Sequence, residues 1–360
     1  MSDDFIAGLR GDLVEAAARE RARGRAGRAA RPFLPWAWSP RIVLRAAAAA
    51  VAAAAFVVAV LALAHPRPAE PARPRIVGTI PTGVAPFCES YADGRLWIAD
   101  SAGGLVTIDL ARRRVTGRVR VGASPTGIVG GRDGVWERMD SGGASRVVRI
   151  DPATGRTSAQ VGVGRGAGLA VDERFVWAPT NASSAPAGID RIDRARGVVT
   201  RRLPVAGAVD VVSAGGILWA PTRGGALLEI DATTGRVLER FPDVAPAGAS
   251  AMVAADRGMW LLDTQGSEIV RFAGRRIVDR IPVDPDTQPL LARTRSGLWT
   301  VTGGPGSVTA EPTRLVRIDP DTHRVTGTVG LGGQSVQALL GAGRDLLAVT
   351  DRGRVIVVRG

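Results

Sequence analysis

Short segments in which apolar and polar residues alternate recur from residue 75 to the end of the chain. The most regular are eight residues long, as in 75–82 (RIVGTIPT) and 114–121 (RVTGRVRV), and further copies start at residues 156, 198, 236, 276 and 324. Alternation with a period of two, β-branched residues and flanking Gly, Pro and Asp residues are typical of β-strands and tight turns. No helical periodicity appears after residue 75. We therefore expect an all-β domain over 75–360.

Tryptophan marks a longer repeat in the same region. It recurs at Trp97, Trp136, Trp177, Trp219, Trp260 and Trp299, and Leu347 takes the seventh place. The gaps of 39, 41, 42, 41, 39 and 48 residues match the length of a four-stranded propeller blade. Each unit reads as a small apolar inner strand, the Trp strand, a third strand ending in Ile-Asp and the eight-residue outer strand. The spacing predicts a seven-bladed β-propeller with the Trp side chains packed between blades.

The two ends of this repeat do not match. The copy at 75–82 follows only a linker, and the last unit ends at Gly360 without an outer strand. We expect 75–82 to pair with the third strand of the last unit, 354–358, and so to close the ring. Closure removes a sheet edge that would otherwise be open to pairing with other chains.

The repeat resembles a known family. Residues 116–157 show the unit best, with Pro125-Thr126-Gly127, Val135-Trp136 and the segment 149–156 (RIDPATGR). Over 75–360 the chain is similar to YVTN-type and virginiamycin B lyase-like seven-bladed propellers. The resemblance implies the fold, because these repeats are structural. The lyase branch uses histidines and a glutamate around magnesium. Here His65 lies in the linker and His323 in a turn expected on the opposite face, so we expect no lyase chemistry of that kind.

Other chemistry leaves no trace in the sequence. There is no His/Cys cluster for zinc, no histidine placed for a Ser-His-Asp triad and no phosphate-loop motif. We predict no cofactor. The single cysteine, Cys88, excludes an intramolecular disulfide, and its place in an inner strand indicates a small buried residue.

The N-terminal part of the chain reads as a membrane anchor. Residues 46–64 are 19 residues without a charge, a helix of about 28 Å, which is close to the thickness of the hydrocarbon layer. The preceding tail, 1–45, is rich in arginine and contains an amphipathic helix over 3–22, so the positive-inside rule places it in the cytoplasm. The Pro-rich linker 65–74 then holds the propeller outside. We expect a single-pass cell-membrane protein. Cleavage after Ala64 is the alternative.

Charge adds little about partners. The chain has 47 Lys+Arg and 34 Asp+Glu, a net charge of +13, and every basic residue is arginine. A basic total suits nucleic acid or an anionic surface. The arginines recur at turns and in outer strands, however, where charged side chains protect sheet edges. We therefore predict no nucleic-acid binding.

Functional candidates are positions at which a blade departs from the repeat. Glu89 replaces an apolar residue on the first inner strand, Asp210 does so on the fourth, and Arg293 on the sixth. A buried carboxylate is costly unless it is paired or solvated, so such departures indicate a ligand site, or else a local register slip or a satisfied ion pair facing a wet channel. Asp100 and Asp263, three residues after their tryptophans, belong to a set of mostly polar residues that either caps turns or lines the channel mouth. Two long loops, 180–188 and 302–313, lie on the same expected face.

The sequence favours a monomeric scaffold that binds a protein or an envelope ligand, because long loops on a rigid ring are where propellers carry recognition. A lyase or hydrolase that uses a divalent cation at the channel mouth is the first alternative. A signal relay through the 3–22 helix is the second.

Overall fold

The structure, a computed structural model, describes residues 72–360 apart from 123, 132, 142–143, 181–186, 245–250, 257 and 305–310. The predicted helix 3–22, the predicted span 46–64 and most of the linker lie outside the described residues. So do the central parts of the long loops 180–188 and 302–313. Within the described part, no helix is long and apolar enough to cross a membrane.

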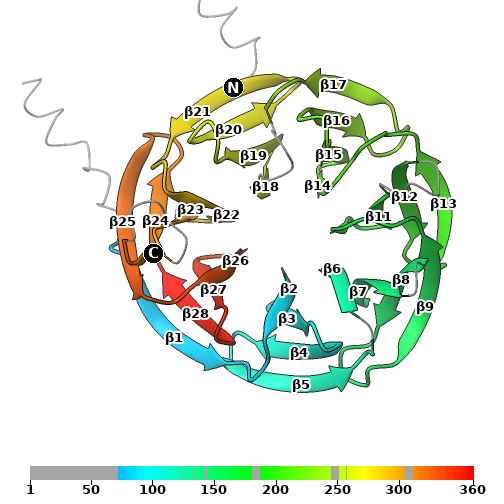
Figure 1. The fold of residues 1–360 in the computed structure, drawn as a ribbon, viewed down its shortest axis with the longest axis horizontal. Coiled ribbons are helices and arrows are strands. Elements are labelled where there is room, and N and C mark those ends of the chain that lie inside the picture. The colour runs from blue at the N-terminus through cyan, green and yellow to red at the C-terminus, as the bar shows by residue number, and fades with distance from the viewer. Residues whose placement is uncertain are drawn as a thin grey trace, which may run out of the picture. The chain divides into compact units, whose positions relative to one another are not determined.

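Seven four-stranded antiparallel sheets are arranged around one axis (Figure 1). This confirms the predicted all-β, seven-bladed propeller. The innermost strand of each blade is one of β2, β6, β10, β14, β18, β22 and β26, and the outermost is one of β5, β9, β13, β17, β21, β25 and β1.

The first four blades take the chain from residue 86 to residue 241. Blade 1 contains β2 Pro86–Ala92, β3 Arg95–Asp100, β4 Gly104–Asp109 and β5 Arg114–Arg120. Blade 2 contains β6 Ser124–Gly131, β7 Gly134–Ser141, β8 Ala144–Ile150 and β9 Thr157–Val163. Blade 3 contains β10 Ala170–Val171, β11 Phe175–Thr180, β12 Gly188–Asp193 and β13 Val198–Leu203. Blade 4 contains β14 Val212–Ala214, β15 Ile217–Pro221, β16 Leu227–Asp231 and β17 Val237–Phe241.

The last three blades follow the same plan until the final strand. Blade 5 contains β18 Ala251–Ala255, β19 Gly258–Asp263, β20 Glu268–Ala273 and β21 Arg276–Pro282. Blade 6 contains β22 Thr287–Thr294, β23 Gly297–Thr302, β24 Thr313–Asp319 and β25 Arg324–Gly332. Blade 7 contains β26 Val336–Ala342, β27 Asp345–Thr350 and β28 Arg354–Arg359, with β1 Arg75–Pro81 as its outer strand.

The ring is closed by β1, as the sequence predicts. β1 runs antiparallel to β28, with Ile80 opposite Val355 and Thr79 opposite Ile356 (Figure 1). Just past β1, the backbone N–H of Thr82 donates to the carbonyl of Gly353 at 2.8 Å, and the Thr82 hydroxyl donates to the same oxygen at 2.9 Å. The first strand of the domain therefore satisfies the outer edge of its last sheet.

The tryptophans fill the wedges between neighbouring blades. All six are buried, and each clusters with apolar residues of the next blade, as Trp177 of blade 3 does with Val211 and Leu218 of blade 4. Leu347 does the same across the closure, where it packs with Leu96 and Ile98 of blade 1. The packing role predicted for this position is confirmed, and one cluster spans each of the seven junctions.

The aspartates of the Ile-Asp pairs that recur at the ends of the third strands cap the following turns. The Oδ1 atom of Asp151 accepts the backbone N–H of Ala153 at 2.8 Å, and Asp231 accepts those of Thr233 and Thr234. Asp109, Asp193 and Asp319 accept backbone N–H groups in the same turn of their own blades. This capping is the turn chemistry that the sequence predicts.

Blade 6 holds the segment that leads into β1. The Arg317 guanidinium, which is fully buried, donates to the backbone carbonyl of Ala72 at 3.0 Å. Pro74 lies against Gly327 so closely that a Cβ added there would be 2.3 Å from the proline ring. The chain is therefore fixed on blade 6 before it reaches the closing strand.

Removing the buried contact of β1 should destabilise the whole ring. Ile80 is 2% exposed and Ile76 on the same strand is 45% exposed. We expect Ile80→Ala to lower the free energy of unfolding by about 2–4 kcal/mol, because it leaves a cavity in the seam. Ile76→Ala, the matched control, should change it by less than about 0.5 kcal/mol. Urea unfolding checks both, and equal effects would contradict a seam held together by packing.

Candidate functional site

Two of the predicted site residues cap turns. Asp100 ends β3, and its Oδ1 atom accepts the backbone N–H groups of Ala102 and Gly104 at 2.9 and 2.8 Å. Asp263 ends β19 and accepts those of Gln265 and Gly266 at 2.9 and 3.0 Å. At the same position of their blades, Thr180, Thr222 and Thr350 are buried. Asp100 and Asp263 thus make turn-capping hydrogen bonds, whereas the buried Thr350 hydroxyl has no partner in the described part of the chain.

Glu89 and Asp210 are carboxyl groups on the inner layer of the ring. Glu89 lies on β2, and its Oε1 atom is buried with no hydrogen-bond partner among the described residues. Burial raises its pKa to about 7. Asp210 lies just before β14 and accepts the backbone N–H of Val211 at 2.8 Å. Burial raises its pKa to about 6, and it packs so tightly on Gly168 that a Cβ there would be 2.0 Å from Oδ1.

Arg293 lies at the other end of the blades from Asp100 and Asp263. It stands one residue before the end of β22, beside the hairpin that leads into β23. Its two terminal nitrogens each donate to one carboxylate oxygen of Asp256 at 2.9 Å. Arg293 and Asp256 thus form an ion pair.

The structure does not bring the five predicted residues together. Asp100 and Glu89 belong to blade 1, Asp210 precedes β14 of blade 4, and Asp263 and Arg293 lie in blades 5 and 6. Among the described residues, no group of three or more His, Cys, Asp or Glu side chains could hold a metal ion.

A buried carboxyl group that the sequence analysis missed lies between blades 1 and 2. Glu137 follows Trp136 on β7, is 1% exposed, and its Oε2 atom has no partner within the described part of the chain. Burial, together with the nearby negative charge of Asp100, raises its pKa to about 7. Burial also raises the pKa of the Cys88 thiol to about 12, helped by Glu89 and Glu137. Cys88 is accordingly an unreactive thiol.

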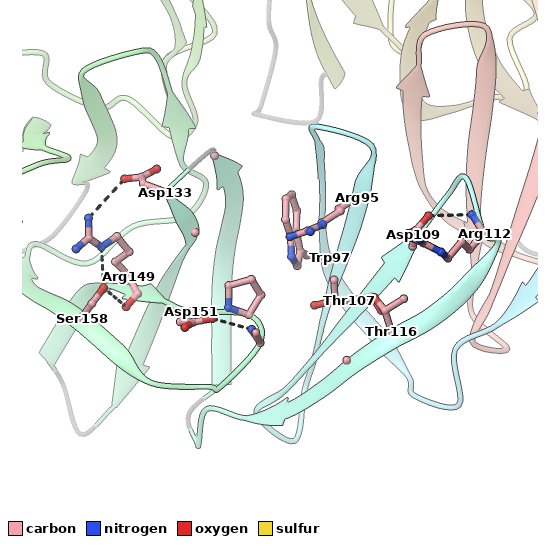
Figure 2. Close-up of a pocket in the computed structure, with 15 residues that line it drawn as sticks. Arg95, Trp97, Thr107, Asp109, Arg112, Thr116, Asp133, Arg149, Asp151 and Ser158 are labelled. Carbon is pink, nitrogen blue, oxygen red and sulfur yellow. Dashed lines mark hydrogen bonds and ion pairs between the residues drawn. The ribbon is translucent and has the colours of Figure 1, made fainter.

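A groove with a volume of about 750 Å³ lies between blades 1 and 2. We call it the 1–2 groove. Figure 2 shows its two walls, with Arg95, Trp97, Thr107 and Thr116 on blade 1 and Asp133, Arg149, Asp151 and Ser158 on blade 2. Its size falls within the range of small-molecule and side-chain binding sites.

The third strand of blade 1 lacks the arginine that stands opposite the tryptophan in blades 2, 3, 5 and 6; blades 4 and 7 lack it too and carry Glu229 and Val357 there. In blades 2, 5 and 6 the residue paired with the tryptophan on the third strand is an arginine, whose guanidinium lies 5.3–5.9 Å from the indole ring. In blade 1 the residue paired with Trp97 is Thr107. The corresponding recess between blades 5 and 6, where Arg271 is present, has a volume of only about 420 Å³.

The indole N–H of Trp97, like those of Trp136 and Trp219, has no hydrogen-bond partner among the described residues. In blades 3 and 6 the residue five before the tryptophan accepts this N–H: Asp172 at 2.8 Å and Thr294 at 3.0 Å. The same position in blade 1 is Ala92. Trp97 is 2% exposed and Thr107 is 6% exposed, and neither the indole Nε1 nor the Thr107 Oγ1 has a hydrogen-bond partner in the described structure. Two buried donors therefore line the groove unpaired.

The charged residues of the groove are mostly paired with each other. Arg112 donates to Asp109 at 2.6 Å. Asp133 accepts from Arg194, and Arg149 donates to Ser158 at 2.7 Å while lying 3.6 Å from Asp133. In contrast, no hydrogen bond or ion pair joins the Arg95 guanidinium to another residue in the described ranges. The signal for this site, a threonine in place of arginine ten residues after Trp97, was readable in sequence only once the strand register was known.

The fold places this chain in the class of seven-bladed β-propellers. No protein-family model matches the sequence, and no curated protein matches it either. Among solved structures, the chain is similar to the β-propeller domain of Cps50 (Swd1) from Myceliophteria thermophila, with a TM-score of 0.64 and 15% sequence identity. The match covers 80% of this chain and 99% of that domain. At this identity the likeness concerns the fold alone.

The buried carboxyl group between blades 1 and 2 should make stability depend on pH. Because the pKa of Glu137 is raised from 4.5 to about 7, the folded state favours its neutral form. Its contribution is fully present below about pH 4.5 and is lost as the pH rises through 7. The unfolding free energy of Glu137→Gln minus that of the wild type should increase by about 2–3 kcal/mol when the pH is raised from 5 to 9.

Urea unfolding of both proteins across this pH range measures the difference. Glu173→Gln, at an exposed site, is the control and should follow the wild type. A difference between Glu137→Gln and wild type that does not change with pH would mean that this carboxyl group does not titrate between pH 5 and 9.

Proposed function

We propose that the protein is a binding scaffold that presents a rigid propeller to a protein partner in the cell envelope. The observation that carries the proposal is the 1–2 groove. Two buried hydrogen-bond donors and one uncommitted guanidinium line it, whereas the described residues contain no cluster suited to metal-assisted chemistry. Unpaired buried donors cost stability, and a bound partner supplies the missing acceptors.

The proposal includes a cellular location and a membrane orientation. We infer a cytoplasmic tail over 1–45, a transmembrane helix over 46–64, a linker over 65–74 and a propeller outside the cytoplasm. The charge-free run and the arginines before it support this arrangement. The repeat motif supports a relationship to YVTN-type propellers, and we propose that the chain is a membrane-anchored example without lyase chemistry.

Crosslinking tests the binding function. We expect formaldehyde treatment of cells that carry the tagged full chain to attach a small, reproducible set of envelope proteins, identified by mass spectrometry. The control joins residues 1–74 to an unrelated domain and should not capture them. Recovery of the same set by both chains would remove the support for a propeller-borne partner site. Saturable Mg²⁺ or Ca²⁺ binding that is lost in Glu89→Gln would instead favour the cation-dependent enzyme.

Thiol labelling tests the proposed membrane orientation. In a Cys88→Ala background, a membrane-impermeant maleimide should label Arg344→Cys on intact cells, because Arg344 is exposed on the propeller. The same reagent should label Ser2→Cys only after the membrane is permeabilised. The reverse order of labelling would overturn the proposed orientation. An immunoblot of a C-terminal tag separates the uncleaved chain from one that starts at His65.

A further inference from the structure

We propose that the 1–2 groove binds the carboxylate of an acidic side chain in a partner protein, with Arg95, Trp97 and Thr107 as its donors. This inference rests on the proposed binding function and names the chemistry that the site recognises. It places recognition on the flank of the ring between two blades.

The unpaired groups of the groove can all donate a hydrogen bond, and the Thr107 hydroxyl can also accept one. The indole N–H of Trp97 and the hydroxyl of Thr107 are buried without partners, and both residues line the groove. Arg95 lines it as well, and its guanidinium has no partner among the residues that the structure describes (Figure 2). A carboxylate accepts such hydrogen bonds at both oxygens, and charge-assisted bonds to arginine are the strong ones.

Three arginines and three aspartates line the groove, and one of these arginines is uncommitted. Of the three arginines that line it, Arg112 and Arg149 already contact aspartates, so only Arg95 is uncommitted. The aspartates Asp109, Asp133 and Asp151 line the same recess. A phosphate group with its two charges would meet these carboxylates and have only one free cation to balance them. A single carboxylate is neutralised by Arg95 alone.

The groove does not suit a sugar that stacks on an aromatic ring. A Cβ added to Gly130 would lie 2.1 Å from Cζ3 of Trp97, so the backbone of blade 2 covers that part of the ring. The residue is also only 2% exposed. Trp97 therefore contributes its N–H and offers no open ring face. Its burial between blades holds that donor in one position.

A protein segment suits both the volume and the charge of the surroundings. A recess of about 750 Å³ is much larger than a carboxylate group and leaves room for neighbouring residues of an extended chain. Residues 72–360 contain 37 arginines and 28 acidic residues, a net charge of +9. A basic domain attracts acidic partners and accelerates their association.

Magnetic resonance on the full chain, in detergent micelles with ¹⁵N-indole-labelled tryptophan, tests the inference. The eight tryptophans give one indole signal each, and Trp97→Phe assigns the relevant one. The probes are the capped tripeptide Gly-Glu-Gly, its Gly-Gln-Gly counterpart, inorganic phosphate and maltose at equal ionic strength. We expect the Glu peptide to shift the Trp97 signal saturably and to bind at least tenfold more tightly than the other probes.

Variants locate the binding. Thr107→Arg restores the arginine found in blades 2, 5 and 6, so it should fold normally, fill the groove and weaken binding at least tenfold. Arg95→Met should weaken it similarly, whereas Arg344→Met, which removes an equal charge at an exposed site of blade 7, should not. Unchanged binding in Thr107→Arg, equal binding of the Gln peptide, tighter binding of phosphate or maltose, or no Trp97 shift would each overturn the inference.

The failure of this inference is distinguishable from the failure of the proposed function. If crosslinked partners persist in cells carrying Thr107→Arg, the scaffold function stands and the groove is not its site. If the wild-type chain captures no specific partner, the proposed function fails whatever the tripeptide does.

Discussion

Six residue pairs join β1 to β28 and make the two ends of the domain neighbours in one sheet. Without this pairing, blade 7 would keep three strands, and β28 would present an open edge. The pairing also brings blade 7 against blade 1, where Leu347 packs with Leu96 and Ile98. A similar apolar cluster fills each junction between neighbouring blades, and the cluster between blades 7 and 1 forms only when the ring is closed.

Much of the fold was predictable because it depends on features that recur at fixed spacing. The tryptophan period, the Ile-Asp turns and the spare strand at 75–82 together specify seven blades and their closure, and each is a local pattern repeated many times. The assignment of Asp100 and Asp263 was open for a physical reason. A carboxylate at a strand end looks the same in sequence whether it caps its own turn or faces a channel, and only the hydrogen bonds to Ala102 and Gln265 decide the matter.

The features that were missed depend on pairs of strands. Glu137 lies one residue from a tryptophan, in a row that is otherwise apolar or threonine, but its burial arises because that row faces blade 1 across the junction. The open groove depends on the residue opposite Trp97, which requires the register of β3 and β4. Sequence reasoning searched the inner strands for departures from the repeat. The informative departure was on the third strand, where an arginine usually covers the indole ring.

The contacts that hold Ala72 and Pro74 on blade 6 bear on how the domain responds to mechanical load. A force transmitted along the N-terminal segment meets the Arg317 hydrogen bond and the contact between Pro74 and Gly327 before it reaches Arg75. In a chain anchored at its N-terminus, the arrangement proposed above, these contacts with blade 6 would take up part of a pull before it reaches β1.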